Sequence, residues 1–379
     1  MAENVGKRGS GWYYRFDLPT GPDGKRRQRR VSGFRTERDA RNALAEATVA
    51  VSQQRLRYAP TVTFEDLARE WLSVIGSDRK ATTIANYEML VDAYLIPRIG
   101  SLRLDRLTAP RIQHLYVELR ASGGRDARPL SGTHVRNIHR VLHNVLAYAC
   151  RMGYLALNPA DAVERPRDDT AERTIYSPEQ TRRFLEVAKG GRLGALWYLA
   201  ISAGLRRAEL AGLQWQDVDL EATPAQLWVR ASRSLAGSRV VESGPKTKAG
   251  RRMLVLDERA VGALTDHRER MEAEADLRAD GRPVGYVFVD EVGEPFHPAR
   301  LTRMLHGLQR KAGLPEITLH DLRHTSATIA LLAGVHPKVV AERHGHASTQ
   351  ITLDRYSHVL QPMQVAAAAS IGEFLNPIP

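Results

Sequence analysis

Two linker-like segments divide this chain into three regions. Each region is therefore expected to form a hydrophobic core of its own. YAPTVT at 58–63 and NPADAVERPRDDTAERT at 158–174 contain prolines and lack the apolar spacing of a helix or strand. A chain of 379 residues is long enough for two or three domains. We therefore expect three domains, over residues 1–57, 58–165 and 166–379.

The first region is predicted to form a β-hairpin followed by a helix. Alternate residues of GWYYRFDL are apolar and share one face: Trp12, Tyr14, Phe16 and Leu18. GPDG at 21–24 supplies turn residues, and KRRQRRV returns as a basic strand. Thr36 and Asp39 have the spacing of a capping box, which predicts a helix over 37–55.

The second region is predicted to be a compact helical unit. Its apolar spacing indicates four helices, at about 64–75, 82–95, 109–121 and 132–152. The candidate N-caps are Thr63, Thr108 and Ser131 or Thr133, and Gly153 is a candidate stop. An apolar stripe runs along the last helix, formed by Val135, Ile138, Leu142, Val145 and Leu146.

The charge of the chain favours an anionic partner. Lysine and arginine total 55 against 43 acidic residues, a formal charge of +12. This balance suits nucleic acid or an acidic membrane surface, and we favour nucleic acid. We expect no membrane partner and a cytoplasmic protein, since no apolar run of about 18 residues and no secretory signal are present. The single Cys150 excludes an intramolecular disulfide and a multi-cysteine zinc site.

Two basic surfaces are candidates for contact with double-stranded DNA. A β-ribbon rich in arginine can enter a major groove, and the candidates on the predicted hairpin are Lys25, Arg27 and Arg29. On the helix at 132–152, Arg136 and Arg140 lie away from the apolar stripe and are candidates for phosphate contact. The alternative for both surfaces is a basic face that is merely solvated.

The third region is predicted to mix helices with one small antiparallel sheet. SPEQ at 177–180 combines an N-cap, a proline and a capping-box glutamine, which predicts a helix start. Helices are expected at 178–188, 192–203, 257–275 and 363–375, among others, and strands at AQLWVRAS, SRVVE, RRMLVL and YVFVD. The whole chain is therefore expected to be multi-domain and mainly α, with small β-sheets.

The stretch LHDLRHTSAT poses a choice between a metal site and a phosphate site. His320 and His324 stand four apart beside Asp321, similar to the zinc signature H-E-x-x-H with Asp in place of Glu. Arg323 argues against a metal, as do the missing glutamate base and the lack of an evident third ligand. A guanidinium matches the geometry of a phosphate, and His320 shares a helix face with Arg323. We therefore expect phosphate binding and no metal.

Four boxes of the third region, taken in order, resemble the signature boxes of the tyrosine recombinases, the phage integrase family: GLRRAEL, HDLRHT, HGHAS and ITLDRYSH. The resemblance implies an arm-type DNA-binding domain at 1–57, a helical core-binding domain with a SAM-like fold at 58–165, and an α+β catalytic domain with a tail helix at 166–379. It also implies site-specific recombination that integrates or excises a mobile element. The strands would be cut and rejoined through a 3′-phosphotyrosine, without metal or cofactor.

The resemblance assigns roles to five residues of these boxes. Tyr356 would be the nucleophile, and Arg206 and Arg323 would bind the scissile phosphate. His320 would accept the phenol proton or hydrogen-bond to the phosphate, and His346 would hold a non-bridging oxygen. A phenol with a pKa near 10 is ionised to only about one part in a thousand at pH 7, so the positive residues would stabilise its anion.

Three further residues complete the predicted site. Lys246 would protonate the leaving 5′-oxygen, with Lys248 as its rival, and Glu209 would support the arginine or histidine side chains. The chain departs from the family box Leu-Gly-His, where it has HGH at 344–346. His324 is expected to be structural, and His344 and His358 are expected to be structural or surface residues.

The resemblance also implies partners and leaves two alternatives. A homotetramer on DNA and a monomer in free solution are expected, with accessory bending or excision factors as possible partners. One alternative is a type IB-like topoisomerase, which uses the same chemistry but exchanges no DNA partners. The other is a catalytically inactive DNA-binding regulator of the same fold, in which one of the catalytic residues would be missing.

Overall fold

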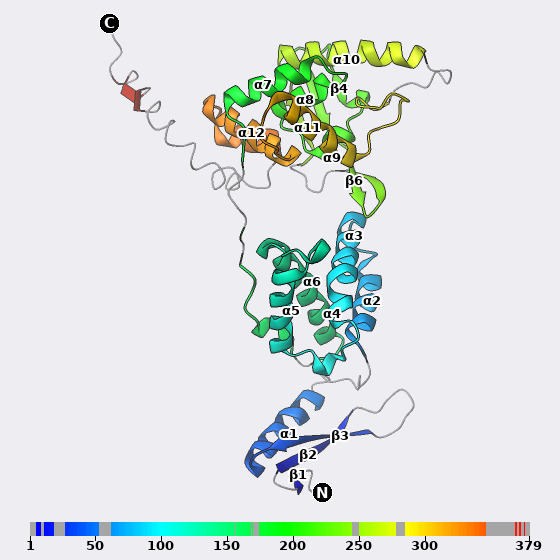
Figure 1. Cartoon of the computed structure of the whole chain (residues 1–379), viewed down its shortest axis with the longest axis vertical. Coiled ribbons are helices and arrows are strands. Elements are labelled where there is room, and N and C mark those ends of the chain that lie inside the picture. Colours follow the sequence, from blue (N-terminus) through cyan, green and yellow to red (C-terminus); the bar gives the residue numbers. More distant parts are fainter. Residues whose placement is uncertain are drawn as a thin grey trace. The chain divides into compact units, whose positions relative to one another are not determined.

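The computed structural model describes residues 5–8, 11–18, 27–52, 62–155, 157–167, 169, 174–244, 250–277 and 285–345, with 368, 369, 371, 372 and 375. It divides into two compact units, Met1–Ala171 and Glu172–Pro379 (Figure 1). Within the described residues, no helix is long and apolar enough to cross a membrane. The expected fold class, mainly α with small antiparallel sheets, is confirmed.

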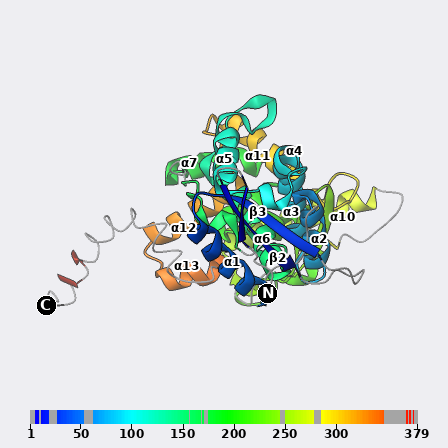
Figure 2. The same ribbon diagram turned by 90° about the horizontal axis from the view of Figure 1, so that it is seen from below.

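The first unit begins with a three-stranded antiparallel sheet and a helix. The strands, in sheet order, are β1 (Val5–Arg8), β2 (Gly11–Leu18) and β3 (Arg27–Phe34). Helix α1 (Glu37–Ser52) packs on one face, where Tyr14 and Phe16 are buried (Figures 1 and 2). Strand β1 was not predicted, because VGKR is too short to show an alternating pattern.

The remainder of the first unit is helical, as predicted. Its helices are α2 (Phe64–Ile75), α3 (Ala81–Leu90), α4 (Ile96–Ile99), α5 (Ala109–Ser122) and α6 (Gly132–Arg151). One π-helical turn at Val91–Leu95 joins α3 to α4, so the helix predicted to end at 95 continues to Ile99. Thr63 caps α2 in a capping box with Asp66, as its sequence indicated. The apolar stripe of α6 is fully buried in this core.

The second unit mixes helices with two small antiparallel sheets instead of the single sheet expected. One sheet contains β4 (Val218–Asp219), β5 (Gln226–Val229) and β8 (Arg252–Val255), and the other contains β6 (Ser232–Ala236) and β7 (Arg239–Ser243). The strand predicted at YVFVD is not formed. Its residues make isolated bridges instead, Gln214 with Tyr286 and Val289 with Pro295.

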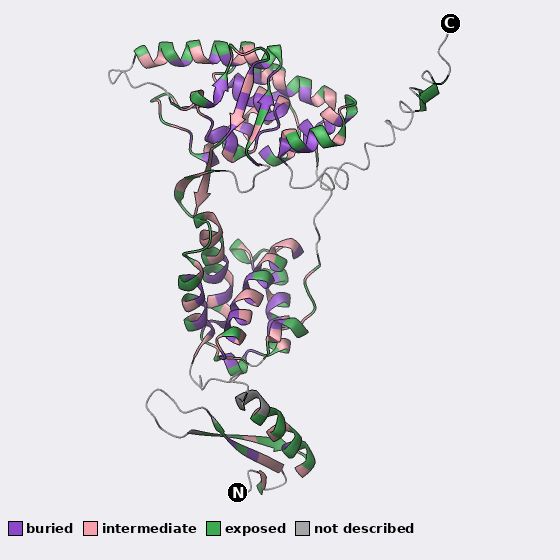
Figure 3. Ribbon diagram, turned by 180° about the vertical axis from the view of Figure 1, so that it is seen from behind, coloured by how far each residue is buried: buried purple, intermediate pink, exposed green. Residues whose placement is uncertain are grey.

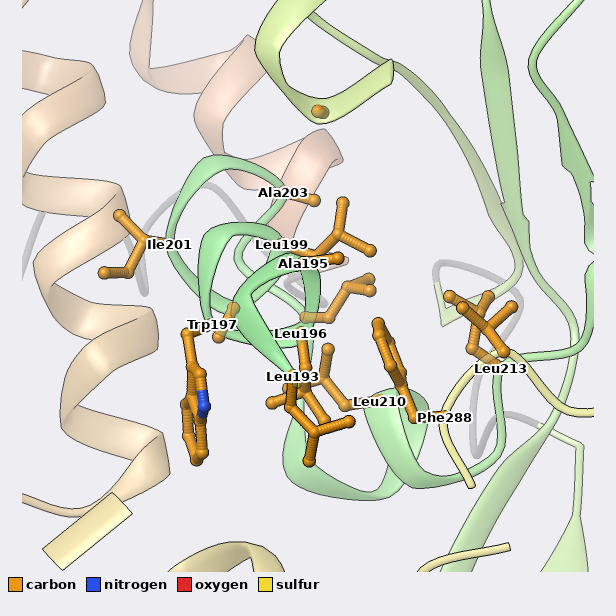
Figure 4. Packing of buried hydrophobic residues seen from close by; sticks show 14 of the residues in the cluster. Leu193, Ala195, Leu196, Trp197, Leu199, Ile201, Ala203, Leu210, Leu213 and Phe288 are labelled. Carbon is orange, nitrogen blue, oxygen red and sulfur yellow. The ribbon is translucent and has the colours of Figure 1, made fainter. Parts of the chain in front are cut away.

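The named helices of the second unit lie between residues 178 and 344. They are α7 (Pro178–Lys189), α8 (Gly194–Ser202), α9 (Arg207–Ala211), α10 (Glu258–Asp276), α11 (Pro298–Ala312), α12 (Leu319–Leu332) and α13 (Pro337–His344). Leu196 and Leu199 of α8 lie in the centre of the core, with Leu210 and Phe288 on one side of the helix and Trp197 on the other (Figure 4). Figure 3 shows that buried residues gather there, while the outer face of α10 is exposed.

Candidate active site

Arg206 stands immediately before α9, where the chain turns into the helix. Its backbone N–H donates to Glu209 Oε2 at 2.9 Å, and its Nη1 donates to Glu209 Oε1 at 2.7 Å. Its Nη2 donates to the carbonyl of Gly345 at 2.8 Å. The side chain is nevertheless 38% exposed, so this guanidinium can be reached from solvent. The predicted support of Arg206 by Glu209 is therefore a direct contact.

Glu209 also binds a second arginine that sequence reasoning missed. Arg252, the first residue of β8, donates from Nη1 and Nη2 to the two carboxylate oxygens at 3.1 and 2.9 Å. Burial alone would raise the pKa of Glu209. The hydrogen bonds and charges of Arg252 and the charge of Arg206 outweigh burial and lower this pKa to about 2. Glu209 is therefore a carboxylate at any working pH.

Arg323 lies on the inner face of α12 and is only 2% exposed. Its Nη1 donates to the carbonyl of Gly204 at 2.6 Å, and its Nη2 donates to the carbonyl of His344. Gly204 has a φ of +60°, and a Cβ at this position would lie 2.4 Å from His344 Nε2. A larger residue at 204 would therefore push apart the two segments that hold the Arg323 guanidinium.

Three consecutive carbonyls at the end of α13 accept hydrogen bonds from three arginines. Arg252 Nε donates to the carbonyl of Arg343 at 2.6 Å, while Arg323 binds the carbonyl of His344 and Arg206 that of Gly345. The last carbonyls of a helix have no partner within it and carry partial negative charge, which favours cations. Gly345 ends the helix with a φ of +58°.

The two histidines of LHDLRHT lie in different environments. His320 is exposed, whereas His324 is 5% exposed, and their rings meet edge to face at 4.6 Å between centroids. Asp321 accepts from the backbone N–H of Thr318 at 2.9 Å and completes the capping box of α12. Its place beside His320 thus has a structural reason. In the described part of the chain, no three His, Cys, Asp or Glu side chains gather as metal ligands.

The other residues of the predicted site lie outside the described residues. These are Lys246, its rival Lys248, His346 and Tyr356, together with His358 and most of the helix predicted at 363–375. His344, expected to be structural or on the surface, is 2% exposed, and its ring lies within hydrogen-bond distance of the Val340 carbonyl and Ser326 Oγ. The described site thus joins Arg206, Glu209 and Arg323 and adds Arg252.

The proposed DNA-contact residues of the first unit are described in part. Arg136 and Arg140 are exposed on α6. Lys25 lies outside the described residues, and for Arg27 and Arg29 only the backbone in β3 is described. A basic cluster not named by the sequence analysis lies on the same sheet. The guanidinium carbons of Arg30 and Arg15 lie 3.7 and 5.4 Å from the ring centroid of Tyr13.

Three family models match consecutive parts of the chain. The Phage integrase family matches residues 176–362, which include the arginine site. The Arm DNA-binding domain matches residues 4–51, and the Phage integrase, N-terminal SAM-like domain matches residues 63–120. The chain belongs to the phage integrase family of tyrosine recombinases. It is a DNA breakage-and-rejoining enzyme that carries out site-specific recombination.

Known proteins of similar sequence or fold agree with this assignment. A tyrosine recombinase XerC-like protein of Caldanaerobacter subterraneus is 28% identical over 82% of this chain and 83% of its own length. The fold resembles that of the Tn1549 transposon integrase in complex with a circular intermediate DNA, with a TM-score of 0.66 and 23% identity over 82% of this chain and 99% of that one. It also resembles a lambda integrase tetramer bound to a Holliday junction, with a TM-score of 0.59 and 16% identity over 93% and 94% of the two chains.

Proposed function

We propose that this recombinase integrates or excises a mobile element through a 3′-phosphotyrosine formed by Tyr356. The observation that carries the proposal is the convergence of Arg206, Arg252 and Arg323 on three successive carbonyls, with His346 as the next residue in the chain. A displaced phosphodiester develops negative charge on its non-bridging oxygens, and guanidinium groups stabilise that charge. Arg206 and Arg323 bind the scissile phosphate, and His346 holds one of its oxygens.

The proposed cleavage is a transesterification that needs no outside reactant. The Tyr356 oxygen bonds to phosphorus while its proton passes to His320, which is exposed on α12 and three residues before Arg323. The bond from phosphorus to the 5′-oxygen breaks, and Lys246 gives a proton to that oxygen. The 3′-phosphotyrosine keeps the energy of the phosphodiester, so another 5′-hydroxyl can attack it and restore the enzyme.

The proposed DNA contacts involve both parts of the first unit. On the N-terminal sheet, Arg15 and Arg30 are exposed and lie against Tyr13, so their guanidinium planes are supported by an aromatic ring. We assign these two residues to DNA contact in addition to Lys25, Arg27 and Arg29. Arg136 and Arg140 on α6 bind phosphates of the core site. Such contacts position the protein on DNA without reading its sequence.

The proposed assembly is a homotetramer on DNA that forms from monomers, with accessory bending or excision factors as further partners. Two duplexes contain four strands to be cut, and each cut uses one tyrosine. The lambda integrase tetramer on a Holliday junction, which has a similar fold, supports this stoichiometry. The Tn1549 transposon integrase supports a mobile element as the source of the DNA ends.

A suicide substrate tests the proposed nucleophile. DNA that carries the attachment core of the element is nicked close to the scissile phosphate and incubated in EDTA with the wild type and with Tyr356→Phe. We expect a covalent protein–DNA band on a denaturing gel with the wild type alone. A band of equal strength with Tyr356→Phe would move the nucleophile to another residue, and a wild-type band that forms only in a parallel reaction without EDTA would contradict metal-free chemistry.

A further inference from the structure

Arg252 joins its own strand, β8, to Glu209 and to the end of α13, three segments that lie far apart in the sequence. Its side chain is 7% exposed, and its three nitrogens donate to Glu209, to the carbonyl of Arg343 and to the carbonyl of Gly250. Glu209 in turn accepts a hydrogen bond from Arg206, and Arg343 precedes His346 by three residues. A buried guanidinium with this many bonds fixes the spacing of all three segments.

We infer that Arg252 is a positioning residue for strand cleavage, which acts through Glu209 on Arg206; the inference rests on the proposed function. Each carboxylate oxygen of Glu209 accepts one bond from Arg252 and at least one from Arg206. The carboxylate is therefore shared, and Arg206 does not neutralise it alone. Together the two arginines and Glu209 carry one net positive charge, which remains available to a phosphate.

The hydrogen bonds around Arg206 form a closed ring. Arg206 binds Glu209, Glu209 binds Arg252, and Arg252 Nε binds the carbonyl of Arg343. Two residues further along the backbone, the carbonyl of Gly345 accepts from Arg206 Nη2 at 2.8 Å and closes the ring. Removal of Arg252 opens this ring and leaves the buried Glu209 carboxylate with Arg206 as its remaining arginine among the described residues. Arg206 is then drawn toward Glu209 and away from the DNA phosphate.

A second arginine in the same unit has similar bonds, and among the described residues they lead to other segments than those of this ring. Arg192 Nε and Nη2 donate to Glu274 at 2.9 and 2.6 Å, and Arg192 also donates to the carbonyls of Val289 and Asp290. Its side chain is 21% exposed. Arg192 is therefore a matched control for an arginine that only braces the fold.

The first test compares Arg252→Met, Arg252→Lys and Arg192→Met in the full chain. Single-turnover cleavage of the suicide substrate is measured at saturating DNA, with melting temperature and DNA affinity measured in parallel. We expect cleavage to fall about 100-fold in Arg252→Met and about tenfold in Arg252→Lys, with the dissociation constant changed less than about threefold. Arg192→Met is expected to melt earlier and to cleave at the wild-type rate. Equal cleavage rates in Arg252→Met and Arg192→Met would overturn the inference.

A double-mutant cycle tests whether Arg252 acts through Arg206. In an Arg206→Lys background, we expect Arg252→Met to lower the cleavage rate by less than about threefold further, because a lysine lacks the fork that bonds Glu209 and the Gly345 carbonyl together, so the ring is already open. Independent, multiplicative losses would overturn the inference. If Arg252→Met does not fold, Arg252→Lys takes its place in the cycle.

A substrate with sulfur in place of the 5′-oxygen separates this route from one through Lys246. A thiolate leaves without a proton, so a defect in the general acid disappears with this substrate, whereas a defect in phosphate binding persists. We expect the Arg252→Met defect to persist. If the defect disappeared with the sulfur substrate, Arg252 would act through Lys246, the proposed general acid, and the inference would be overturned. Failure of the proposed function is distinct, since wild-type enzyme would then form no covalent product on either substrate.

Discussion

The arginines of the N-terminal sheet and those of the catalytic unit have the same side chain but differ in their exposure to solvent. Arg15 and Arg30 are exposed and lie against the Tyr13 ring, whereas the side chains of Arg252 and Arg323 are nearly buried and bonded to backbone carbonyls. An exposed arginine can follow a phosphate that moves, and its energy depends on salt. A buried arginine is fixed in advance, which is what charge stabilisation in a transition state requires. The difference predicts affinity effects at the first site and rate effects at the second.

The largest effect, on the cleavage rate, is expected from a substitution at Arg323. Arg323→Lys keeps the charge but cannot bind both the Gly204 and His344 carbonyls with a planar fork. We expect the single-turnover cleavage rate to fall about 1000-fold, on the scale of a lost oxyanion-hole donor, with DNA affinity nearly unchanged. Rapid-quench assays at saturating DNA measure this. Weaker binding with an unchanged rate would break the contrast between the two kinds of arginine.

Glu209 is expected to contribute to stability at neutral pH. Glu209→Gln removes a buried carboxylate between two arginines, at a cost of about 3 to 5 kcal/mol in the free energy of unfolding. The pKa of Glu209 is lowered from 4.5 to about 2, so its contribution is complete above pH 4.5 and is lost as pH falls toward 2.

Denaturant unfolding of wild type and Glu209→Gln at several pH values measures this contribution. We expect the gap between the two proteins to close as pH falls below 4.5. A gap that stays constant across this range would show that the carboxylate charge is not the source of the stability.

Substitution of the exposed arginines is expected to change the affinity for DNA without changing the cleavage rate. The double variant Arg15→Ala, Arg30→Ala should reduce the dependence of log affinity on log salt concentration by about 1 to 2, since each phosphate contact releases counterions. Fluorescence anisotropy over a salt series measures the slope. Arg41→Ala is the matched control, because Arg41 is an exposed arginine paired with Glu37 on α1. Equal slopes in both variants would remove the sheet from the DNA interface.

The smallest effect is expected at a helix cap. Ser177 accepts from the backbone N–H of Gln180 at 3.2 Å in the capping box of α7. Ser177→Ala should cost about 1 kcal/mol of unfolding free energy, with no change in cleavage or DNA affinity. Thermal unfolding and the cleavage assay measure both. A changed cleavage rate would mean that α7 takes part in the chemistry as well as in the fold.

Local signals in the sequence predicted the helices well and the sheets less well. The caps at Thr63 and Ser177 depend on neighbouring residues, so their spacing was sufficient. Strand β1 and the failure of YVFVD to form a strand depend on which partners are available, which one segment does not reveal. The family boxes indicated Arg206, Glu209 and Arg323. Arg252 was missed because its partner Glu209 lies 43 residues earlier in the chain. In addition, Arg251 beside it is also an arginine, so the sequence does not show which of the two is buried.

The carbonyls at the end of α13 have a consequence for how this chain can change over time. Every amino acid has a backbone carbonyl, so an exchange of the side chain at Arg343 leaves the acceptor for Arg252 in place. A deletion or insertion within α13 is different, because each residue turns a helix by about 100°. One residue more or fewer would turn all three carbonyls away from their arginines at once. The length of α13 therefore constrains this site more directly than the identity of the side chain at 343 does.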